Sequence, residues 1–427
     1  MSLWSRLGAS GRGFASILSA TALAQVISFV ALPLLSRLYS PEAFGVFTLV
    51  IAVVAIVAPV ATLRLESAAM LAAEGSEVRA VVRNAVTSIV AVGLATFIII
   101  QVLEVAGVWS AGSVHLSALW VSILVILTSL FSLLSQLALR ERKYALVARR
   151  NLYQAVAMSV GQAAASLVSR AATGLLIGYV LGRLVALVSL WRPTREYFGR
   201  TDRGVRRAAW RTYWKFPLVF TPSALLNALG SQAPVIFIIT WFGAGLGGQV
   251  GMAERIVAVP LALIGAAAGQ VLEAEMSRTI RAGEHRVRRL YLRTSAMLAG
   301  VALLCVAGFI LLGGWLVPIL LGQEWVIAGT AVQILALSAG VRLVASPMSK
   351  IIILYQHSLA NTILDVSRVF LIACAFGAIA LLELPLDIAL WLIYGALAAT
   401  YAVTWFYGLH VASHARGVPD QDPVDDS

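Results

Sequence analysis

Residues 44–65 read FGVFTLVIAVVAIVAPVATLRL, and this stretch decides the class of fold. It holds one charge, Arg64, in a run of the length that a membrane-spanning helix needs, about 20 mostly apolar residues. Similar runs recur along the chain, of which 60% is apolar and 12% charged. Soluble domains are about 45–50% apolar and about 25% charged. The composition excludes a soluble globular protein, a disordered chain and a disulfide scaffold, and continuous apolar runs exclude a β-barrel.

The same pattern predicts an all-α polytopic membrane protein with twelve transmembrane helices. The first apolar run is too long for a cleaved signal peptide, so we expect an uncleaved first helix. The predicted spans are residues 15–36, 44–65, 84–106, 117–138, 151–169, 172–191, 216–240, 247–271, 294–314, 327–347, 357–382 and 386–409.

The positions of lysine and arginine predict the orientation. With the N-terminus placed inside, 26 of the 32 basic residues fall in cytoplasmic segments, and only Arg37 and Arg170 fall in outer loops. Cytoplasmic loops of membrane proteins carry such an excess of Lys and Arg. We therefore expect both termini in the cytoplasm. The net charge of +12 then serves to hold the loops at an anionic leaflet, and we expect no nucleic-acid partner.

The longest loop, residues 192–215, lies between the sixth and seventh predicted spans. It predicts an N-terminal six-helix lobe over residues 1–200, a C-terminal six-helix lobe over 201–410 and an acidic cytoplasmic tail over 411–427. Proline spacing suggests a weak repeat, because Pro33 and Pro59 are 26 residues apart, as are Pro234 and Pro260. Interrupted helices at matching places in two lobes are typical of transporters, so we expect these prolines to interrupt their helices.

Motifs for catalysis or cofactors are lacking in the sequence. A P-loop needs Gly-Lys-Ser/Thr, and none of the three lysines follows a glycine. Gly243, Gly245 and Gly248 match G-x-G-x-x-G but lie in a predicted turn between membrane helices. Asp420 and Asp422 form a D-x-D pattern in the acidic tail, and Cys305 and Cys374 lie in apolar runs. We expect no enzyme, no cofactor and no metal site.

Ionisable residues inside the predicted spans are the candidate functional residues, because an arginine at the bilayer centre costs about 2.5–3.5 kcal/mol on insertion scales. Such residues are tolerated where they meet a partner or a water-filled cavity. For Arg183 and Arg342 the alternative is a side chain that reaches the headgroups, for Arg368 a structural pair with Asp365, and for Arg64 a topological charge. The candidates for binding an anion or sugar are Arg64, Arg255, Arg342, Arg368, Gln25 and Asn227, with Gln232, Gln270 and Asn361 as further amides.

The residues by themselves indicate a secondary transporter of an anionic or polar solute. Their order and spacing are also similar to a known family, the Wzx-type polysaccharide flippases of the multidrug/oligosaccharidyl-lipid/polysaccharide exporter superfamily. The segments that resemble it are ATALAQVISFVALPLLSRLYSPEAFGVFTL (20–49), ATLRLE (61–66), YWKFPLVFTPSALLNALGSQAPVIFI (213–238), GMAERIVAVPLALIGAAAGQV (251–271), GQEWVIAG (322–329) and ASPMSK (345–350).

The resemblance implies two six-helix lobes around a central cationic cavity. It implies a lipid-linked oligosaccharide flippase that moves undecaprenyl-diphosphate-linked glycan units across the bacterial inner membrane for surface polysaccharide, driven by an ion gradient. It carries over Arg64, Glu66, Glu254 and Arg255 as lumen residues. Its implied partners are the polyprenyl-diphosphate-linked oligosaccharide, membrane lipids, and the polymerase and glycosyltransferases of glycan assembly.

Two functions are left in competition. The alternative is a cation-coupled multidrug antiporter of the same superfamily, which would need buried carboxylates, whereas the buried charges here are mainly arginines. For the flippase we expect proton coupling through at least one of Glu66, Glu254 and Asp365, since each lies in or at the end of a span beside an arginine. An ionised carboxylate would compete with phosphate for that arginine, and a proton would remove the competition.

Overall fold

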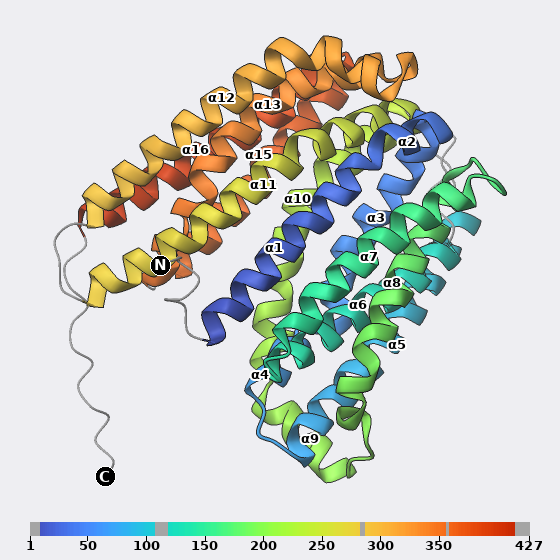
Figure 1. Ribbon diagram of the computed structural model, residues 1–427, viewed down its shortest axis with the longest axis vertical. Coiled ribbons are helices and arrows are strands. Elements are labelled where there is room, and N and C mark those ends of the chain that lie inside the picture. The colour runs from blue at the N-terminus through green and yellow to red at the C-terminus, as the bar shows by residue number, and fades with distance from the viewer. Residues whose placement is uncertain (1–8, 107–117, 282–286, 356–357, 415–427) are drawn as a thin grey trace. The chain divides into compact units, whose positions relative to one another are not determined.

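A computed structural model describes residues 9–106, 118–281, 287–355 and 358–414, and this part of the chain is helical without strands (Figure 1). The α-helices are α1 (Ala9–Val30), α2 (Leu32–Leu38), α3 (Pro41–Thr62), α4 (Leu65–Leu71), α5 (Ser76–Val105), α6 (Ala118–Arg140), α7 (Tyr144–Ala165), α8 (Ala172–Thr194), α9 (Arg203–Thr212), α10 (Thr221–Phe242), α11 (Ala244–Arg281), α12 (Val287–Leu321), α13 (Val326–Met348), α14 (Lys350–Leu354), α15 (Ser358–Leu382) and α16 (Leu386–Ser413). Short turns of other helix types are η2 (Arg195–Phe198), η3 (Phe216–Phe220) and η4 (Gln323–Trp325).

A helix lies at each of the twelve predicted spans. Eleven stretches of the described chain are long and apolar enough to cross a membrane, and they cover every predicted span except the fifth. That span corresponds to α7, whose 22 residues reach about 33 Å at 1.5 Å per residue but include Arg149 and Arg150. The chain is therefore an all-α, multi-pass membrane protein in which α7 is the most polar of the long helices at predicted spans.

The helices divide into two compact units. The described residues of 1–252 and 319–325 form the first unit, and those of 253–318 and 326–427 form the second. The division falls inside α11, after Met252, because α10 packs against α3 in the first unit. Six of the predicted spans precede the 192–215 linker and six follow it, and the lobe boundary at residue 200 stays a prediction.

In the first unit, α7 packs against α1 and α8, and α3 packs against α6, α8 and α10. Close approach depends on small residues, as it does between membrane helices generally. A Cβ atom at Gly178 of α8 would lie 2.3 Å from the backbone nitrogen of Gln162 on α7, and one at Gly182 would lie 2.8 Å from Cβ of Met158. Helices α7 and α8 are thus closely packed at these two glycines.

In the second unit, α16 packs against both α13 and α15. Tyr291 of α12 is fully buried and donates a hydrogen bond to the backbone oxygen of Trp405 on α16 at 2.7 Å. A Cβ atom at Gly265 of α11 would lie 3.3 Å from the Leu343 side chain on α13, and one at Gly269 would lie 3.7 Å from Pro347. These contacts are looser than that of Gly178. Thus α16 is the central helix against which α12, α13 and α15 hold their polar side chains.

The expected interruption of helices by proline is found at one position of the four. The chain leaves the helix at Ala31 and resumes at Leu32, so Pro33 lies in the first turn of α2, where its missing N–H costs nothing. Pro59, Pro234 and Pro260 lie inside α3, α10 and α11, which continue through them. The prediction was wrong for these three, because a membrane helix tolerates a proline when its neighbours compensate the freed carbonyl.

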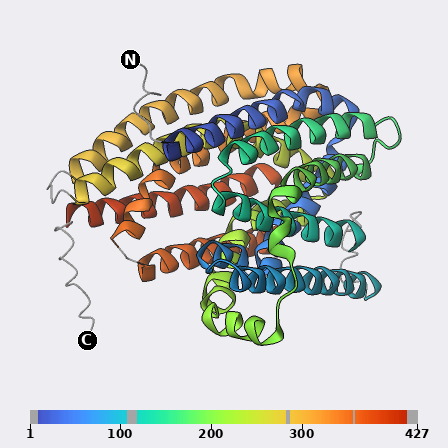
Figure 2. The same ribbon diagram turned by 60° about the horizontal axis from the view of Figure 1, so that its bottom comes forward.

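The linker between α8 and α10 contains the basic helix α9, which packs against α5 (Figure 2). Ala209 is buried in a cluster with apolar residues of α5, and Arg206 donates to the Asn84 side chain at 2.9 Å. Tyr213 donates to Glu77 at 2.8 Å; burial and this hydrogen bond raise the pKa of Tyr213 to about 12. The phenol therefore stays protonated at neutral pH and fixes the end of the linker.

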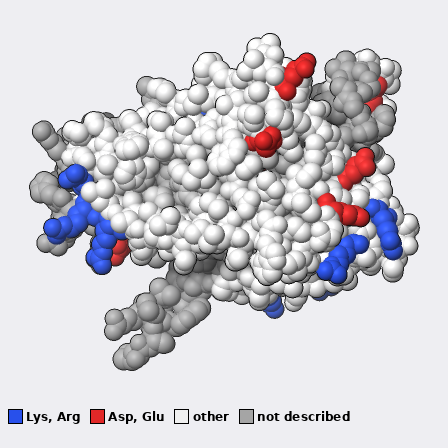
Figure 3. Space-filling view, turned by 90° about the horizontal axis from the view of Figure 1, so that it is seen from above, with Lys and Arg blue, Asp and Glu red and all other residues white. Residues whose placement is uncertain are grey.

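The face drawn in Figure 3 is mostly free of charged side chains. Large apolar side chains are exposed on the long helices, among them Leu304 (76%) and Leu311 (77%) of α12. Soluble monomers rarely expose large apolar surfaces of this kind to water, whereas membrane proteins expose them to the hydrocarbon of the bilayer. The surface agrees with a membrane protein.

Candidate functional site

Arg64 and Glu66 lie where α3 gives way to α4 in the first unit. Leu63 and Arg64 both have left-handed backbone, with φ of 51° and 56°. Such a conformation costs a non-glycine residue about 1–3 kcal/mol and is commonest at functional sites. It ends α3 and starts α4 in a new direction, so the TLRLE run forms a rigid corner.

This corner brings an arginine to a buried carboxylate. Nη1 of Arg64 lies 3.5 Å from Oε1 of Glu66, whose side chain is 4% exposed while that of Arg64 is 41% exposed. The second carboxylate oxygen of Glu66 and the Nε of Arg64 are buried and have no hydrogen-bond partner in the described part of the chain. Glu66 is therefore an incompletely satisfied acid beside an accessible guanidinium.

The candidate amides of the first unit are less informative. Gln25 of α1 and Asn227 of α10 are exposed, and Gln232 of α10 is partly buried. The side chains of Gln270 and Asn361 lie outside what the structure describes. The assignment of Gln25 and Asn227 to substrate binding stays a prediction.

A second group of candidates converges in the second unit. Tyr394 of α16 is 6% exposed and donates a hydrogen bond of 2.5 Å to Oε1 of Glu254 on α11. Arg255 of α11 and Arg342 of α13 are both near enough to act electrostatically on the Glu254 carboxylate. Sequence reasoning had paired Glu254 only with its neighbour Arg255. Tyr394 and Arg342 were not predicted as its partners, because they come from other helices.

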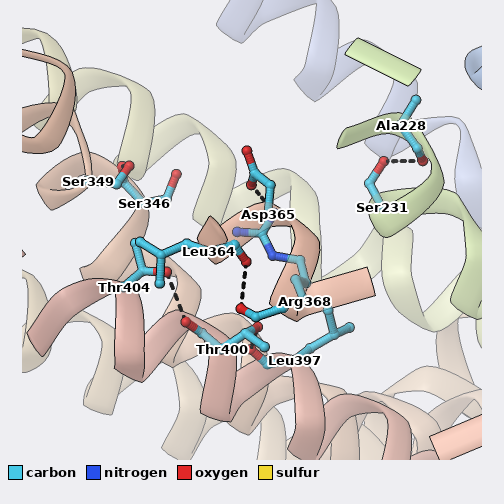
Figure 4. A network of polar contacts seen from close by, with 11 residues as sticks. Ala228, Ser231, Ser346, Ser349, Leu364, Asp365, Arg368, Leu397, Thr400 and Thr404 are labelled. Atoms are coloured by element: carbon cyan, nitrogen blue, oxygen red, sulfur yellow. Dashed lines mark hydrogen bonds and ion pairs between the residues drawn. The ribbon is translucent and has the colours of Figure 1, made fainter. Parts of the chain in front are cut away.

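Two helical turns after Tyr394 on α16, the ring of Tyr401 makes cation–π contacts with two arginines. Cζ of Arg368 on α15 lies 5.0 Å from the centre of the Tyr401 ring, and Cζ of Arg342 lies 6.0 Å from it. Nη1 of Arg368 lies 3.5 Å from Oδ1 of Asp365, one turn before it. Figure 4 shows this pair beside Thr400 of α16. The structural pair with Asp365, which the sequence offered as the alternative to a binding role for Arg368, is present, and the binding role stays a prediction.

These contacts place five predicted residues in one polar cluster of the second unit, which we call the α16 cluster. Its members are Glu254, Arg255, Arg342, Asp365 and Arg368, held by Tyr394 and Tyr401. Tyr394 and Tyr401 are seven residues apart and lie on one face of the helix. Three arginines outnumber two carboxylates, so the α16 cluster carries a net positive charge that suits an anion.

Arg368 and Arg342 differ in accessibility. The Arg368 side chain is 15% exposed, and its Nε is buried with no partner among the described residues. Arg342 is exposed, and its guanidinium reaches Tyr401 rather than extending along its own helix. Arg342 thus joins the α16 cluster, and its role in binding stays a prediction.

Sequence reasoning missed a buried arginine. It assigned Arg150 to a cytoplasmic loop, but α7 begins at Tyr144 and Arg150 is 6% exposed within the first unit. Arg183, for which contact with the headgroups was one alternative, donates to the hydroxyl of Tyr179 at 2.7 Å. The signal available in the sequence was Asn151 directly after Arg150, a polar pair at the start of the fifth predicted span.

Among the described residues no group of His, Cys, Asp or Glu is arranged to hold a metal ion. Cys305 and Cys374 are free thiols. Gly243, with φ of 91°, ends α10 as the predicted turn, while Gly248 lies inside α11. The acidic tail with Asp420 and Asp422 lies outside the described residues.

Comparison with known proteins adds a family and a fold. A family model described as polysaccharide biosynthesis protein matches residues 34–329, more than half of the chain. A search of curated proteins finds no match. Among solved structures, lipid II flippase MurJ in an inward closed conformation is 12% identical with a TM-score of 0.67, and covers 92% of this chain and 89% of its own.

Two further structures carry the same fold. An outward-facing multidrug resistance MATE family transporter of the MOP superfamily is 15% identical with a TM-score of 0.53, and 95% of each chain is covered. A MOP superfamily transporter from Pyrococcus furiosus is 14% identical with a TM-score of 0.58, and covers 96% of this chain and 98% of its own. The chain belongs to the polysaccharide biosynthesis protein family and has the helical fold of the MOP superfamily, which confirms the resemblance in its sequence.

Proposed function

We propose that this protein is a flippase for polyprenyl-diphosphate-linked oligosaccharides, acting without catalysis in the bacterial inner membrane, with both termini in the cytoplasm. Membership of a polysaccharide biosynthesis family supports a glycan substrate, and the shared fold supports a transporter. The observation that carries the proposal is the convergence of Arg342 and Arg368 on the Tyr401 ring, with Arg255 and Glu254 in the same unit.

The α16 cluster suits the diphosphate of such a lipid. Guanidinium stays charged at every relevant pH, and its planar fork matches phosphate oxygens in two bonds at once. Arg368 and Arg342 each retain donors beyond those facing the ring. In the proposed cycle these arginines hold the headgroup, and Arg64, Gln25 and Asn227 of the first unit stay further candidates for substrate contact.

The membrane potential favours export of a negatively charged headgroup. The inside-negative potential is worth about 2.3 kcal/mol per unit charge per 100 mV, and it drives a negative headgroup outward. The empty cationic site must then return without its anion, and this step needs a trigger of its own. In the proposed cycle Glu254 binds the cluster's arginines when ionised and yields them to phosphate when protonated, with Glu66 and Asp365 as the other candidate carboxylates.

The competing function is a cation-coupled antiporter of drugs, since one structure of this fold is a multidrug resistance transporter. A cationic drug would meet three arginines and two carboxylates in the α16 cluster. Repulsion in this site disfavours that substrate, and measurements of glycan export and drug transport by the same variants separate the two functions.

The test replaces Arg368 or Arg255 by Ala and measures export of lipid-linked glycan in cells and flipping in proteoliposomes. Each charge-assisted hydrogen bond is worth about 1.5–3 kcal/mol, so loss of two such bonds should lower the rate by at least about a hundredfold. Arg368→Lys should restore part of the rate, because it keeps the charge without the fork. The matched control is Arg288→Ala, on the exposed side of α12 in the same unit.

Membrane levels of every variant are measured by quantitative blotting, so that loss of protein is not read as loss of transport. Full export by both Arg255→Ala and Arg368→Ala would contradict the assignment of the α16 cluster to the diphosphate. Transport of cationic drugs, unchanged by these substitutions and coupled to a cation gradient, would favour the antiporter.

A further inference from the structure

Two arginines meet inside the first unit, on α7 and α8. Arg150 is 6% exposed, and Arg183 is partly buried. The Cζ atom of each lies 4.3 Å from the centre of the Phe131 ring on α6. The two charges also act electrostatically on each other. Two cations therefore share one aromatic ring in the interior of a helical unit.

The hydrogen bonds of this pair go to neutral acceptors. Arg150 donates to the Ser135 hydroxyl and, at 2.5 Å, to Oδ1 of Asn151, and Arg183 donates to the Tyr179 hydroxyl. The Nε atoms of both arginines are buried and meet no acceptor among the described residues. Two N–H donors thus remain directed into the interior without a bond.

Counter-charge is also lacking on the helices around the pair. From its first residue to its last, each of α1, α6, α7 and α8 contains no aspartate or glutamate. Helix α3, which packs against α6 and α8, has a single acid, Glu42, in its first turn. The arginines therefore have no carboxylate on these five helices apart from one at the end of α3.

Such an arrangement is costly without a further partner. A buried charge needs a counter-ion and saturated hydrogen bonds, and removal of either costs several kcal/mol. Stacking on an aromatic ring returns only part of this cost for each cation. It does not offset the repulsion between the two guanidinium groups or bond the two Nε donors. An anion would do both at once.

We propose that Arg150 and Arg183 hold a small monovalent inorganic anion, of the chloride class, between α6, α7 and α8. The anion accepts the two Nε–H bonds and neutralises one of the two charges. It is small because both donors are buried, so a diphosphate that carries a glycan and a polyprenyl chain cannot reach them. The site does not depend on the proposed flipping activity or on the α16 cluster.

The first experiment measures binding of radioactive chloride to the full-length protein in detergent or nanodiscs, with gluconate as the inert anion. Saturable binding is expected in the wild type. Arg183→Gln should weaken it about tenfold or more, since a charge-assisted bond is lost. Arg149→Gln is the matched control, because Arg149 precedes Arg150 on α7 and is exposed. It should bind chloride as the wild type does.

The second experiment distinguishes an anion site from a purely structural stack. Wild type should melt several degrees higher in sodium chloride than in sodium gluconate at equal ionic strength, because a ligand of the native state stabilises it. Arg183→Gln should lose this difference and should melt higher than wild type in gluconate, where the repulsion is removed. A structural stack predicts lower melting in both salts.

Inorganic pyrophosphate is the third ligand tested, as a stand-in for the lipid headgroup. Displacement of chloride by pyrophosphate at lower concentration than by bromide would overturn the assignment to a small anion. Absence of saturable chloride binding in the wild type, or equal binding by Arg183→Gln, would overturn the site itself. The wild-type titration decides the question even if a variant does not fold.

Discussion

Three carboxylates that neighbour arginines in sequence have different surroundings in the structure. Glu254 accepts a hydrogen bond from Tyr394 and interacts with two arginines, whereas Glu66 faces Arg64 and has one buried oxygen without a partner among the described residues. Asp365 pairs with Arg368 and is more exposed than Glu66. Glu254 is thus the carboxylate most closely linked to the proposed headgroup site.

The prediction at this scale concerns Glu254→Gln. Glutamine keeps the shape and can still accept from Tyr394, but it cannot exchange a proton. We expect flipping in proteoliposomes to become independent of an imposed pH gradient, with the protein level unchanged. Glu275→Gln, at an exposed position later on α11, is the control and should respond to the gradient as wild type does.

If Glu254→Gln still responds to the gradient, Glu66→Gln and Asp365→Gln are tested in the same way. A rate that ignores the gradient in the wild type as well would exclude proton coupling. A sodium-driven or potential-driven cycle would then replace it.

At the scale of elements, the close packing of the first turns of α11 against α3 depends on glycine. A Cβ atom at Gly248 would lie 1.8 Å from the backbone oxygen of Pro41, and one at Gly45 would lie 1.9 Å from that of Ala244. Both contacts join α3 to the first turns of α11 within the first unit. Without a hydrophobic effect between helices in lipid, such backbone contact is a main source of packing energy.

Gly248→Ala should therefore destabilise the first unit. The added methyl group overlaps a backbone oxygen that cannot move aside alone, and overpacking of this kind costs about 1–3 kcal/mol or more. The measurement is the melting temperature in detergent. Gly300→Ala is the matched control, because nothing lies within 4 Å of its Cβ position in α12. It should be neutral or stabilising by up to about 1 kcal/mol. Equal melting of both variants would contradict the close packing of α3 against α11.

On the scale of the whole molecule, the topology depends on α7. This helix is the one predicted span outside the eleven apolar stretches, so its crossing decides the sidedness of everything after it. Its end and the start of α8 are joined by a short segment that contains the exposed Arg170. The positive charges of α7 lie in its N-terminal half, on the predicted cytoplasmic side.

Cysteine labelling tests this crossing. In a background of Cys305→Ser and Cys374→Ser, a membrane-impermeant maleimide added to intact cells should label Arg170→Cys. It should not label Ala145→Cys or Arg195→Cys until the membrane is opened; both positions are exposed. Labelling of all three from one side would show that α7 and α8 do not cross, and the twelve-span topology would fail.

Composition and continuous apolar runs determined the fold class and the positions of the twelve helices, and the order and spacing of short segments carried the family resemblance. Local spacing also determined the Arg368–Asp365 pair, because helix geometry fixes which neighbours share a face. These features depend on residues within one or two turns of each other. They can therefore be read from a single sequence.

Contacts between distant segments could be decided only by the tertiary structure. It brought Tyr394 to Glu254, placed Arg342 and Arg368 on one tyrosine ring, and buried Arg150 beside Arg183. It also left α3, α10 and α11 unbroken at their prolines. The physical reason is that a membrane helix must bury its charges against other helices, and the sequence of one helix does not state which neighbours it will meet.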